Sequence, residues 1–295
     1  MKVLSYFACL LIGFCFLTNG FSQAPKPVTP TLKNVAYAED HKAQVLDVYQ
    51  AESETSLPAM VYIHGGGWRG GSKDRIPHFL AQAHREGWLN VVSVEYRFTD
   101  VAPHPTQVND CTRAIQFVRS QAKQWNIDPD RIGVTGGSAG AHLSLWVALH
   151  DDVAKAESED PVARKSSRVS FAIGFAGPTD WSLLGEIPHQ HPAYRQLLGY
   201  EPGTPAEEMD PGKKKSVSPI SYASPDDPPV LILHGDEDRI VPLQHAIKLE
   251  RFLKEKGGSA ELLVVKGGKH NVAGGVGAGV VERATAFMKT HLSRN

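Results

Sequence analysis

The sequence has little cysteine, almost no net charge and no apolar run long enough to span a membrane, and each shortage excludes a class of protein. Its 295 residues contain three cysteines, too few for a disulfide scaffold and without the paired spacing of a zinc site. Lysine and arginine number 31 and aspartate and glutamate 32, which argues against nucleic acid as the main partner, because such proteins usually present a basic face. The composition, 41% hydrophobic and 21% charged, is that of a folded globular chain.

The N-terminus has the pattern of a secretory signal. A basic start is followed by an almost wholly apolar run at residues 3–17, which is shorter than the roughly 20 residues of a membrane-spanning helix. Small residues precede position 23, so we expect residues 1–22 to be the cleaved signal peptide of a secreted or periplasmic protein. An uncleaved N-terminal anchor is the alternative. A lipoprotein anchor is disfavoured, because Phe14 rather than a small residue precedes Cys15.

The segment after the signal is predicted to be a linker. Residues 23–31 (QAPKPVTPT) are rich in proline and predict an extended stretch without a core of its own. Removal of the signal leaves Cys111 as the only cysteine, so we expect no internal disulfide despite an oxidising compartment. The neighbours of Cys111 look helical, which favours a small buried residue over a nucleophile.

The rest of the chain alternates strand and helix patterns. Apolar runs such as VLIL and LLVV are typical of strands buried on both faces of a parallel sheet. Repeated strand–helix units predict one α/β domain at residues 32–295 with a mostly parallel, doubly wound sheet. Residues 178–229 carry no strong strand pattern, so we expect a lid-like insertion there. The expected strands are 44–50, 59–64, 88–97, 131–137, 168–177, 228–235 and 260–268, and the expected helices are 78–87, 107–125, 139–150, 243–256 and 279–292.

The first chemical motif is Gly136-Gly137-Ser138-Ala139-Gly140, which fits G-x-S-x-G between a strand and a helix. In this context the serine sits on a tight, strained turn that exposes its hydroxyl. The flanking glycines avoid collisions with the neighbouring strand and helix, and the helix N-terminus favours developing negative charge. The pattern predicts Ser138 as a nucleophile, with an ordinary helix N-cap serine as the alternative.

The second motif is the glycine-rich loop HGGGW at residues 64–68, after an earlier expected strand. Glycines let the backbone approach a ligand closely and leave N–H groups free. A carbonyl attacked by Ser138 becomes an oxyanion, and the N–H groups of Gly66, Gly67 and Ala139 could hold it. We expect His64 to brace this loop rather than to act as a base.

The third motif is HGDEDRIVP at residues 234–242, followed further along by His270 in GGKH. Both follow expected strands, so both can project at the carboxyl edge of the sheet. A serine hydroxyl needs a base to become a good nucleophile, and a histidine base needs a carboxylate to fix its tautomer. The order Ser138, Asp238, His270 along the chain is that of α/β-hydrolases.

Other acidic and histidine residues compete for these roles. Asp236 and Glu237 are alternative acids, but Asp238 is favoured because it lies just before the IVP segment that leads to the next helix. His142, one turn beyond the serine, is expected to pack. The His-x-His pair at residues 189–191 could bind a metal, but two ligands without a third are weak evidence. We therefore expect neither a metal nor a cofactor.

Together, HGGGW, GGSAGAH, HGDEDRIVP and GGKH resemble the motifs of α/β-hydrolases of the hormone-sensitive-lipase-like esterases. The chain is also similar, over about residues 35–292, to bacterial secreted esterases described as bifunctional acetylxylan and feruloyl esterases. The resemblance implies the α/β-hydrolase fold and a secreted serine carboxylesterase that hydrolyses short-chain esters, with acetyl or feruloyl groups on polysaccharide as a suggested substrate. It also implies a triad of Ser138, Asp238 and His270 and oxyanion donors at Gly66, Gly67 and Ala139.

The chain departs from the hormone-sensitive-lipase pattern at its N-terminus. Those relatives carry a helical cap, whereas residues 23–58 look like linker and strands, which favours a shallower site covered by residues 178–229. Trp68 and Trp181 are candidate walls of the acyl or alcohol pocket, and core positions are the alternative for both. The expected partner is a small-molecule or polysaccharide-linked ester, with no stable membrane partner. A lipase-like, lactone or peptide hydrolase with the same triad stays open, and a non-catalytic binding module is disfavoured because all three triad positions are present.

Overall fold

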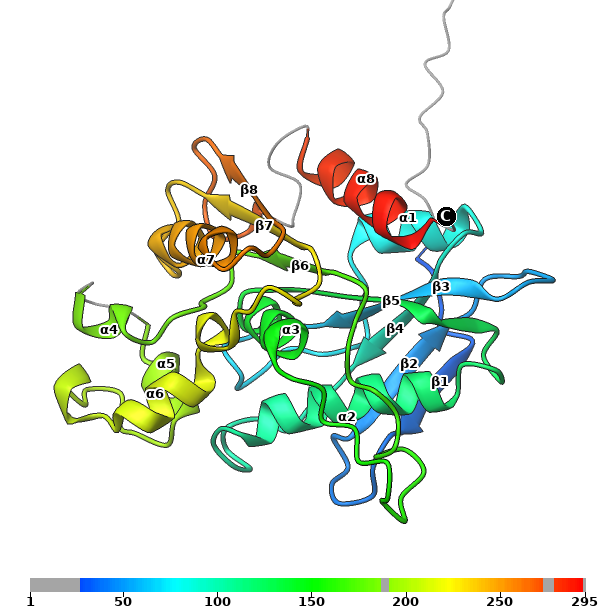
Figure 1. Ribbon diagram of the computed structural model, residues 1–295, viewed down its shortest axis with the longest axis horizontal. Coiled ribbons are helices and arrows are strands. Elements are labelled where there is room, and N and C mark those ends of the chain that lie inside the picture. The colour runs from blue at the N-terminus through cyan, green and yellow to red at the C-terminus, as the bar shows by residue number, and fades with distance from the viewer. Residues whose placement is uncertain (1–26, 187–190, 273–278, 294–295) are drawn as a thin grey trace, which may run out of the picture.

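An eight-stranded sheet forms the centre of the molecule (Figure 1). The computed structural model describes residues 27–186, 191–272 and 279–293. Strand β2 runs antiparallel to both β1 and β4, and all other neighbouring pairs are parallel, in the order β1-β2-β4-β3-β5-β6-β7-β8. The strands are β1 (Leu32–Ala36), β2 (Val45–Tyr49), β3 (Leu57–Ile63), β4 (Asn90–Val94), β5 (Ile127–Gly137), β6 (Ala172–Phe175), β7 (Val230–Gly235) and β8 (Ala260–Val265).

Helices cover both faces of this sheet, which confirms the doubly wound prediction (Figure 1). Helices α1 (His78–Arg85) and α8 (Val280–Leu292) pack on one face, where Phe79 and Phe287 join one apolar cluster. Helices α2 (Thr106–Ser120), α3 (Ala139–Leu149) and α7 (Gln244–Glu255) supply the other cluster, which includes Leu143. Within β3, Met60 belongs to the first cluster and Val61 to the second, so this strand is buried on both faces.

Several elements differ from the sequence-based prediction, among them one helix, one expected strand and one strand that was not predicted. The helix predicted over 107–125 ends at Ser120, because the chain turns back at Asn126, whose φ is +52°, and the Ile127 N–H donates to the Ala122 carbonyl at 2.8 Å. The strand predicted over 168–177 is reduced to the four residues of β6 that pair with β5 and β7. The edge strand β1 was not among the expected strands, because none of its residues is buried and its apolar pattern is short.

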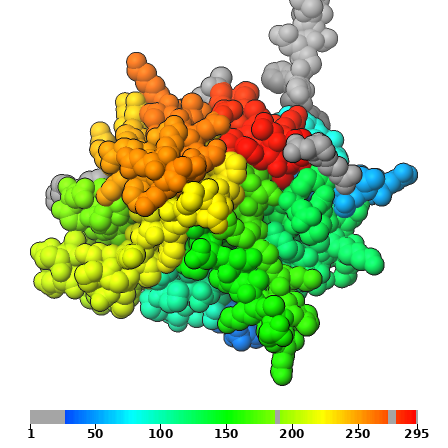
Figure 2. Space-filling view, viewed as in Figure 1, coloured from blue at the N-terminus to red at the C-terminus, as the bar shows by residue number. Residues whose placement is uncertain are grey.

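The predicted insertion contains only short helices in its described residues, 178–186 and 191–229. These are α4 (Leu183–Glu186), α5 (Ala193–Leu197) and α6 (Pro211–Val217), with 3₁₀ turns at Ala206–Glu208 and Pro219–Tyr222. The Trp146 indole N–H of α3 donates to the Ser216 carbonyl at 2.9 Å, which anchors the insertion to the body of the fold. Figure 2 shows the insertion gathered beneath the α7 region at one end of the molecule.

The described part of the predicted linker lies against the domain. The Thr31 N–H donates to the Val48 carbonyl at 2.7 Å, and Val28 packs against the α1–α8 cluster. The remaining linker residues, 23–26, and the predicted signal peptide, 1–22, fall outside the described residues. Within the described part of the chain, no helix is long and apolar enough to cross a membrane.

Candidate active site

Ser138 stands at a sharp turn between β5 and α3. Its φ of +56° and ψ of −122° lie in a region that non-glycine residues rarely occupy, and such strain is kept where the surroundings fix it. A Cβ on Gly136 would lie 2.4 Å from the Ile63 carbonyl oxygen, and one on Gly140 only 2.0 Å from the same atom. The two flanking glycines are therefore required by close approach of β3, as the motif predicted.

His270 and Asp238 follow neighbouring parallel strands and meet Ser138 in one hydrogen-bonded chain. His270 follows β8 and Asp238 follows β7. The His270 Nε2 lies 2.9 Å from the Ser138 Oγ, and the His270 Nδ1 lies 2.8 Å from the Asp238 Oδ2. The arrangement can move the serine proton onto the imidazole and hold the resulting positive charge beside a carboxylate.

The Asp238 carboxylate is fixed as an acceptor by four groups. Burial would raise its pKa, but hydrogen bonds from the His234 and His270 rings and from the Val241 and Ile240 N–H groups hold its pKa well below the usual range. Asp238 therefore stays ionised across the neutral range. The competing acids are placed elsewhere: Asp236 is exposed and accepts from the Gly267 N–H, and Glu237 is exposed as well.

The loop after β3 presents backbone N–H groups beside the serine. Gly66 and Gly67 have φ values of +119° and +62°, and a Cβ on Gly66 would lie 2.1 Å from the Gly70 carbonyl oxygen. Within the described residues, the N–H groups of Gly66, Gly67 and Ala139 donate to no other group. Gly66, Gly67 and Ser138 line one cavity, so these donors are available to an oxyanion formed on a carbonyl bound to Ser138.

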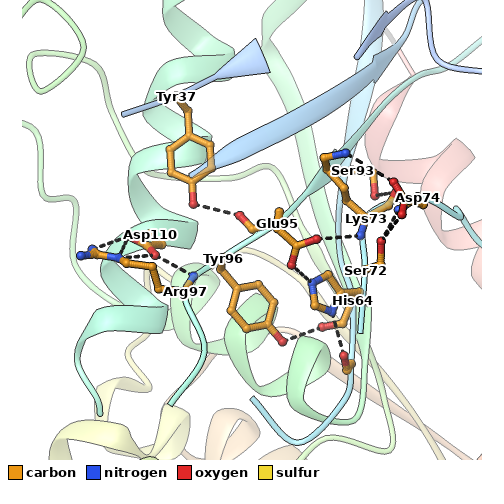
Figure 3. Close-up of polar contacts among 11 residues, drawn as sticks. Tyr37, His64, Ser72, Lys73, Asp74, Ser93, Glu95, Tyr96, Arg97 and Asp110 are labelled. Carbon is orange, nitrogen blue, oxygen red and sulfur yellow. Dashed lines mark hydrogen bonds and ion pairs between the residues drawn. The ribbon is translucent and has the colours of Figure 1, made fainter. Parts of the chain in front are cut away.

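His64 braces this loop, as expected, and its partner is Glu95, which sequence reasoning missed (Figure 3). The His64 Nε2 lies 2.8 Å from the Glu95 Oε1, and its Nδ1 lies 2.7 Å from the Gly65 carbonyl oxygen. The ring stacks on Tyr96 with centroids 4.6 Å apart. Glu95 directly follows β4, the sheet neighbour of the strand that precedes His64, and no local sequence pattern marks it.

Replacement of Glu95 by glutamine is expected to loosen this brace. The amide replaces a carboxylate that accepts from both the His64 ring and the Lys73 N–H, and a lost charge-assisted hydrogen bond costs about 1.5–3 kcal/mol. We expect the urea unfolding free energy to fall by about that amount and kcat on a small ester to fall with it. Unchanged stability and kcat would show that Glu95 does not hold the loop.

A cavity of about 480 Å³ opens beside Ser138. Its walls include Trp68, Tyr194 and Val241, with Arg69 and His191 also in the lining. Trp68 is therefore placed where the sequence predicted a pocket wall. The parallel prediction for Trp181 is wrong: this indole is not among the cavity's lining residues and is fully buried, because it packs behind Trp68 with ring centroids 5.9 Å apart.

His142 joins Trp68 to the insertion. The Trp68 indole N–H donates to the His142 Nδ1 at 3.1 Å, and the His142 Nε2 lies 2.8 Å from the Val217 carbonyl oxygen. Burial lowers the pKa of His142 to about 3, so the ring is neutral and its Nε2–H is the donor to Val217. His142 is therefore buried, as predicted, and its two ring nitrogens link Trp68 in the cavity wall to Val217 in the insertion.

This buried histidine makes stability depend on pH. The unfolded chain takes up a proton at His142 below about pH 6.5, whereas the folded chain does not until about pH 3, so the stability that this group contributes is full above pH 6.5 and declines as the pH falls. The slope is roughly 1 kcal/mol per pH unit. We expect the unfolding free energy, measured in urea between about pH 6.5 and 5, to fall less steeply in His142→Gln, since the amide cannot titrate. If the unfolding free energies of the wild type and His142→Gln fell equally steeply with pH, a neutral buried His142 would be contradicted.

A metal site at the His-x-His pair of residues 189–191 was considered in the sequence analysis. His191 lines the active-site cavity, whereas His189 falls outside the described residues. Among residues that the structure describes, no group of three or more histidine, cysteine, aspartate or glutamate side chains could hold a metal ion. Cys111 is buried on α2, as its helical neighbours indicated.

The parallel sheet, the strained serine turn and the acid and histidine after β7 and β8 define the chain as a member of the α/β-hydrolase fold class. The BD-FAE family model matches residues 46–253, and the chain belongs to this family.

Known proteins agree with this placement. The chain is 30% identical to the probable carboxylic ester hydrolase LipM of Mycobacterium tuberculosis over 72% of its own length and 49% of that protein, and 27% identical to the esterase LipQ of the same organism over 76% and 53%. It thus spans about half the length of these curated relatives. Among solved structures, a truncated carbohydrate esterase from gut microbiota superposes with a TM-score of 0.78 at 27% identity, covering 91% of this chain and 99% of that one. An acetyl ester-xyloside bifunctional hydrolase from Caldicellulosiruptor lactoaceticus gives a TM-score of 0.71 at 26% identity, covering 83% and 86%.

Proposed function

We propose that this chain is a secreted serine carboxylesterase that hydrolyses short-chain esters, with acetyl or feruloyl groups on polysaccharide as the natural substrate. The observation that carries the proposal is the hydrogen-bonded chain of Ser138, His270 and Asp238. Ser138 and His270 line a cavity together with Gly66 and Gly67 of the glycine loop. Its relatives include named esterases, and two similar structures carry carbohydrate or acetyl ester names.

The reaction proceeds through an acyl-enzyme. His270 Nε2 takes the Ser138 proton as the Oγ attacks the ester carbonyl, and the oxyanion is held by the N–H groups of Gly66, Gly67 and Ala139. The imidazolium then gives its proton to the leaving alcohol as the ester C–O bond breaks. Water, deprotonated by the same nitrogen, attacks the acyl-enzyme, and the proton returns to Ser138 as the carboxylic acid leaves.

The proposed acyl preference rests on the cavity. At about 480 Å³ it lies toward the small end of ligand sites, and Trp68, Tyr194 and Val241 give it apolar walls suited to a short acyl chain or an aromatic ring. The proposed export rests on the basic start and apolar run of residues 1–22. Export is tested by expressing the full chain with its signal and sequencing the N-terminus of the protein outside the cytoplasm, where a start at residue 23 is expected.

The activity is tested with a chain-length series of nitrophenyl esters from acetate to decanoate. We expect the rate to peak at acetate or butyrate. A peak at decanoate would favour a lipase-like site, and faster cleavage of matched lactones or amides would favour a lactone or peptide hydrolase. No hydrolysis of any of these substrates would overturn the esterase assignment and bring forward a binding module.

A further inference from the structure

The hydroxyl group of Tyr194 is buried at the wall of the active-site cavity without a hydrogen-bond partner. Tyr194 lies on α5 of the insertion, lines the cavity that contains Ser138 and His270, and is only 2% exposed. Within the described residues, no group donates to its Oη or accepts from it. An unpaired buried hydroxyl lowers the stability of a fold, so one that is kept at a cavity wall points to a partner outside the chain.

The Tyr194 ring is held in place by three other rings. Its centroid lies 5.3 Å from that of Trp181, 6.1 Å from that of Trp68 and 5.9 Å from that of His245. The backbone is fixed as well, since the Trp181 indole N–H donates to the Tyr194 carbonyl oxygen at 3.0 Å. The position of the Tyr194 Oη is therefore set by packing and does not need a ligand to define it.

This hydroxyl is available as a hydrogen-bond donor. Burial, reinforced by the nearby Asp238 carboxylate, raises the pKa of Tyr194 far above its usual value of about 10, so the group keeps its proton at neutral pH. The Trp68 indole N–H in the same wall is already used, because it donates to His142. Among the described side chains of the buried wall, Tyr194 thus supplies a donor that is still open to a ligand.

The burial of Tyr194 places it beside the acyl part of the substrate. The acyl group stays on Ser138 while the alcohol leaves and water enters, so the alcohol must face the open side of the cavity. Arg69 and Ile240, which are exposed, line that open side, whereas Tyr194 and Val241 form the buried side. An acyl chain that extends from Ser138 into the buried side therefore meets Tyr194.

We propose that Tyr194 is a specificity-determining residue whose hydroxyl donates a hydrogen bond to an oxygen atom in the acyl chain of the substrate. The site then favours acyl groups that carry an ether, keto or hydroxyl oxygen beyond the ester carbonyl over hydrocarbon chains of the same size. A hydrocarbon chain leaves the buried donor unpaired, and a site built to hydrogen-bond its substrate rejects the analogue that lacks the partner atom. This inference rests on the proposed esterase function and goes beyond it, since chain length does not distinguish these acyl groups.

The test uses 4-nitrophenyl esters in two matched pairs, methoxyacetate with butyrate and 3-methoxypropionate with pentanoate. Within each pair the chain length is equal and one ether oxygen replaces one CH₂ group. We measure kcat/KM for the wild type and Tyr194→Phe and compare the ether-to-alkyl ratio between the two proteins, because the intrinsic reactivity of each ester then cancels. We expect this ratio to fall about tenfold in Tyr194→Phe for at least one pair, which corresponds to ~1.4 kcal/mol. An unchanged ratio in both pairs would overturn the inference.

Unfolding in urea separates a hydroxyl kept for a ligand from one kept for the fold. Tyr194→Phe removes a hydroxyl without a partner in the described chain, so we expect its urea midpoint to equal or exceed that of the wild type. The matched control is Tyr37→Phe, because Tyr37 is 1% exposed, does not line the active-site cavity, and donates to the Glu95 carbonyl at 2.9 Å. This control should lower the urea midpoint and keep the wild-type ether-to-alkyl ratio. An equal loss of stability in Tyr194→Phe would assign its hydroxyl a structural role and overturn the inference.

The same kinetic data keep this inference distinct from the esterase proposal. Hydrolysis of the esters with the same ether-to-alkyl ratio in the wild type and Tyr194→Phe would leave the esterase standing and remove the role of the hydroxyl. No hydrolysis of any of the esters by the wild type would overturn the esterase proposal, and the role of Tyr194 with it.

Discussion

Ser138→Ala is expected to lower kcat on nitrophenyl acetate by on the order of 10⁶-fold. The change removes the Oγ that lies 2.9 Å from the His270 Nε2 and leaves the backbone donors of the glycine loop in place. Removal of a serine nucleophile leaves only the catalysis that comes from binding and the oxyanion donors. The measurement is the steady-state rate under saturating ester, with the burst of nitrophenol recorded in parallel, since the acyl-enzyme should disappear with it.

This variant should remain folded. Alanine carries the same Cβ as serine and meets the same strain at φ +56°, so the turn loses one side-chain hydrogen bond and no packing. A thermal unfolding temperature close to that of the wild type would show that the variant loses activity because the nucleophile is missing and not because the protein unfolds. A mutant that retained more than about a hundredth of the wild-type kcat would contradict the nucleophile assignment.

Asp238→Asn is expected to lower kcat by on the order of 10⁴-fold. The carboxylate Oδ2 accepts from the His270 Nδ1, and an amide nitrogen in that place would turn the imidazole toward the tautomer that cannot accept the serine proton. The asparagine oxygen can still accept from the N–H groups of Ile240 and Val241, so the loop after β7 should persist. The measurement is kcat/KM on the same ester across a range of pH.

The matched control is Glu237→Gln, the same loss of charge one residue earlier on an exposed side chain. We expect its kcat to stay within about twofold of the wild type. If Glu237→Gln lost as much activity as Asp238→Asn, the effect would belong to the charge of this loop rather than to contact with His270. If neither variant lost activity, the acid would have to be sought elsewhere.

The sequence predicted those features of the fold whose physical cause lies within a few neighbouring residues. Continuous apolar strands predicted a sheet covered on both faces, and β3, with Met60 in one cluster and Val61 in the other, bears this out. The glycines around Ser138 predicted a close approach of strand and helix, and the missing space for a Cβ at Gly136 and Gly140 confirms it. The helix end at Ser120 was missed because buried Trp125 continues the apolar pattern through a turn.

In the candidate site, too, the sequence predicted the residues that lie in local motifs and missed those that do not. Ser138, Asp238 and His270 each follow a strand with a signal of its own, and their order along the chain suggested that they meet. Glu95 carries no local signal, because its role depends on β4 lying next to β3 in the sheet. The choice between core and cavity for Trp68 and Trp181 depends on where residues 178–229 fold back, and the sequence contains no pattern for that.

The sequence by itself determined the fold class, the strained serine turn and the three residues brought together there, because each depends on short-range spacing, glycine geometry and the order of the motifs along the chain. Tertiary structure alone decided what surrounds them: the His64–Glu95 brace, the His142 link between Trp68 and Val217, and the contact of Arg69, just after the glycine loop, with Gln196 of α5. These contacts join segments between 31 and 127 positions apart. No sequence motif marks the partner residues in these contacts, so only the packing of whole elements decides which of them meet.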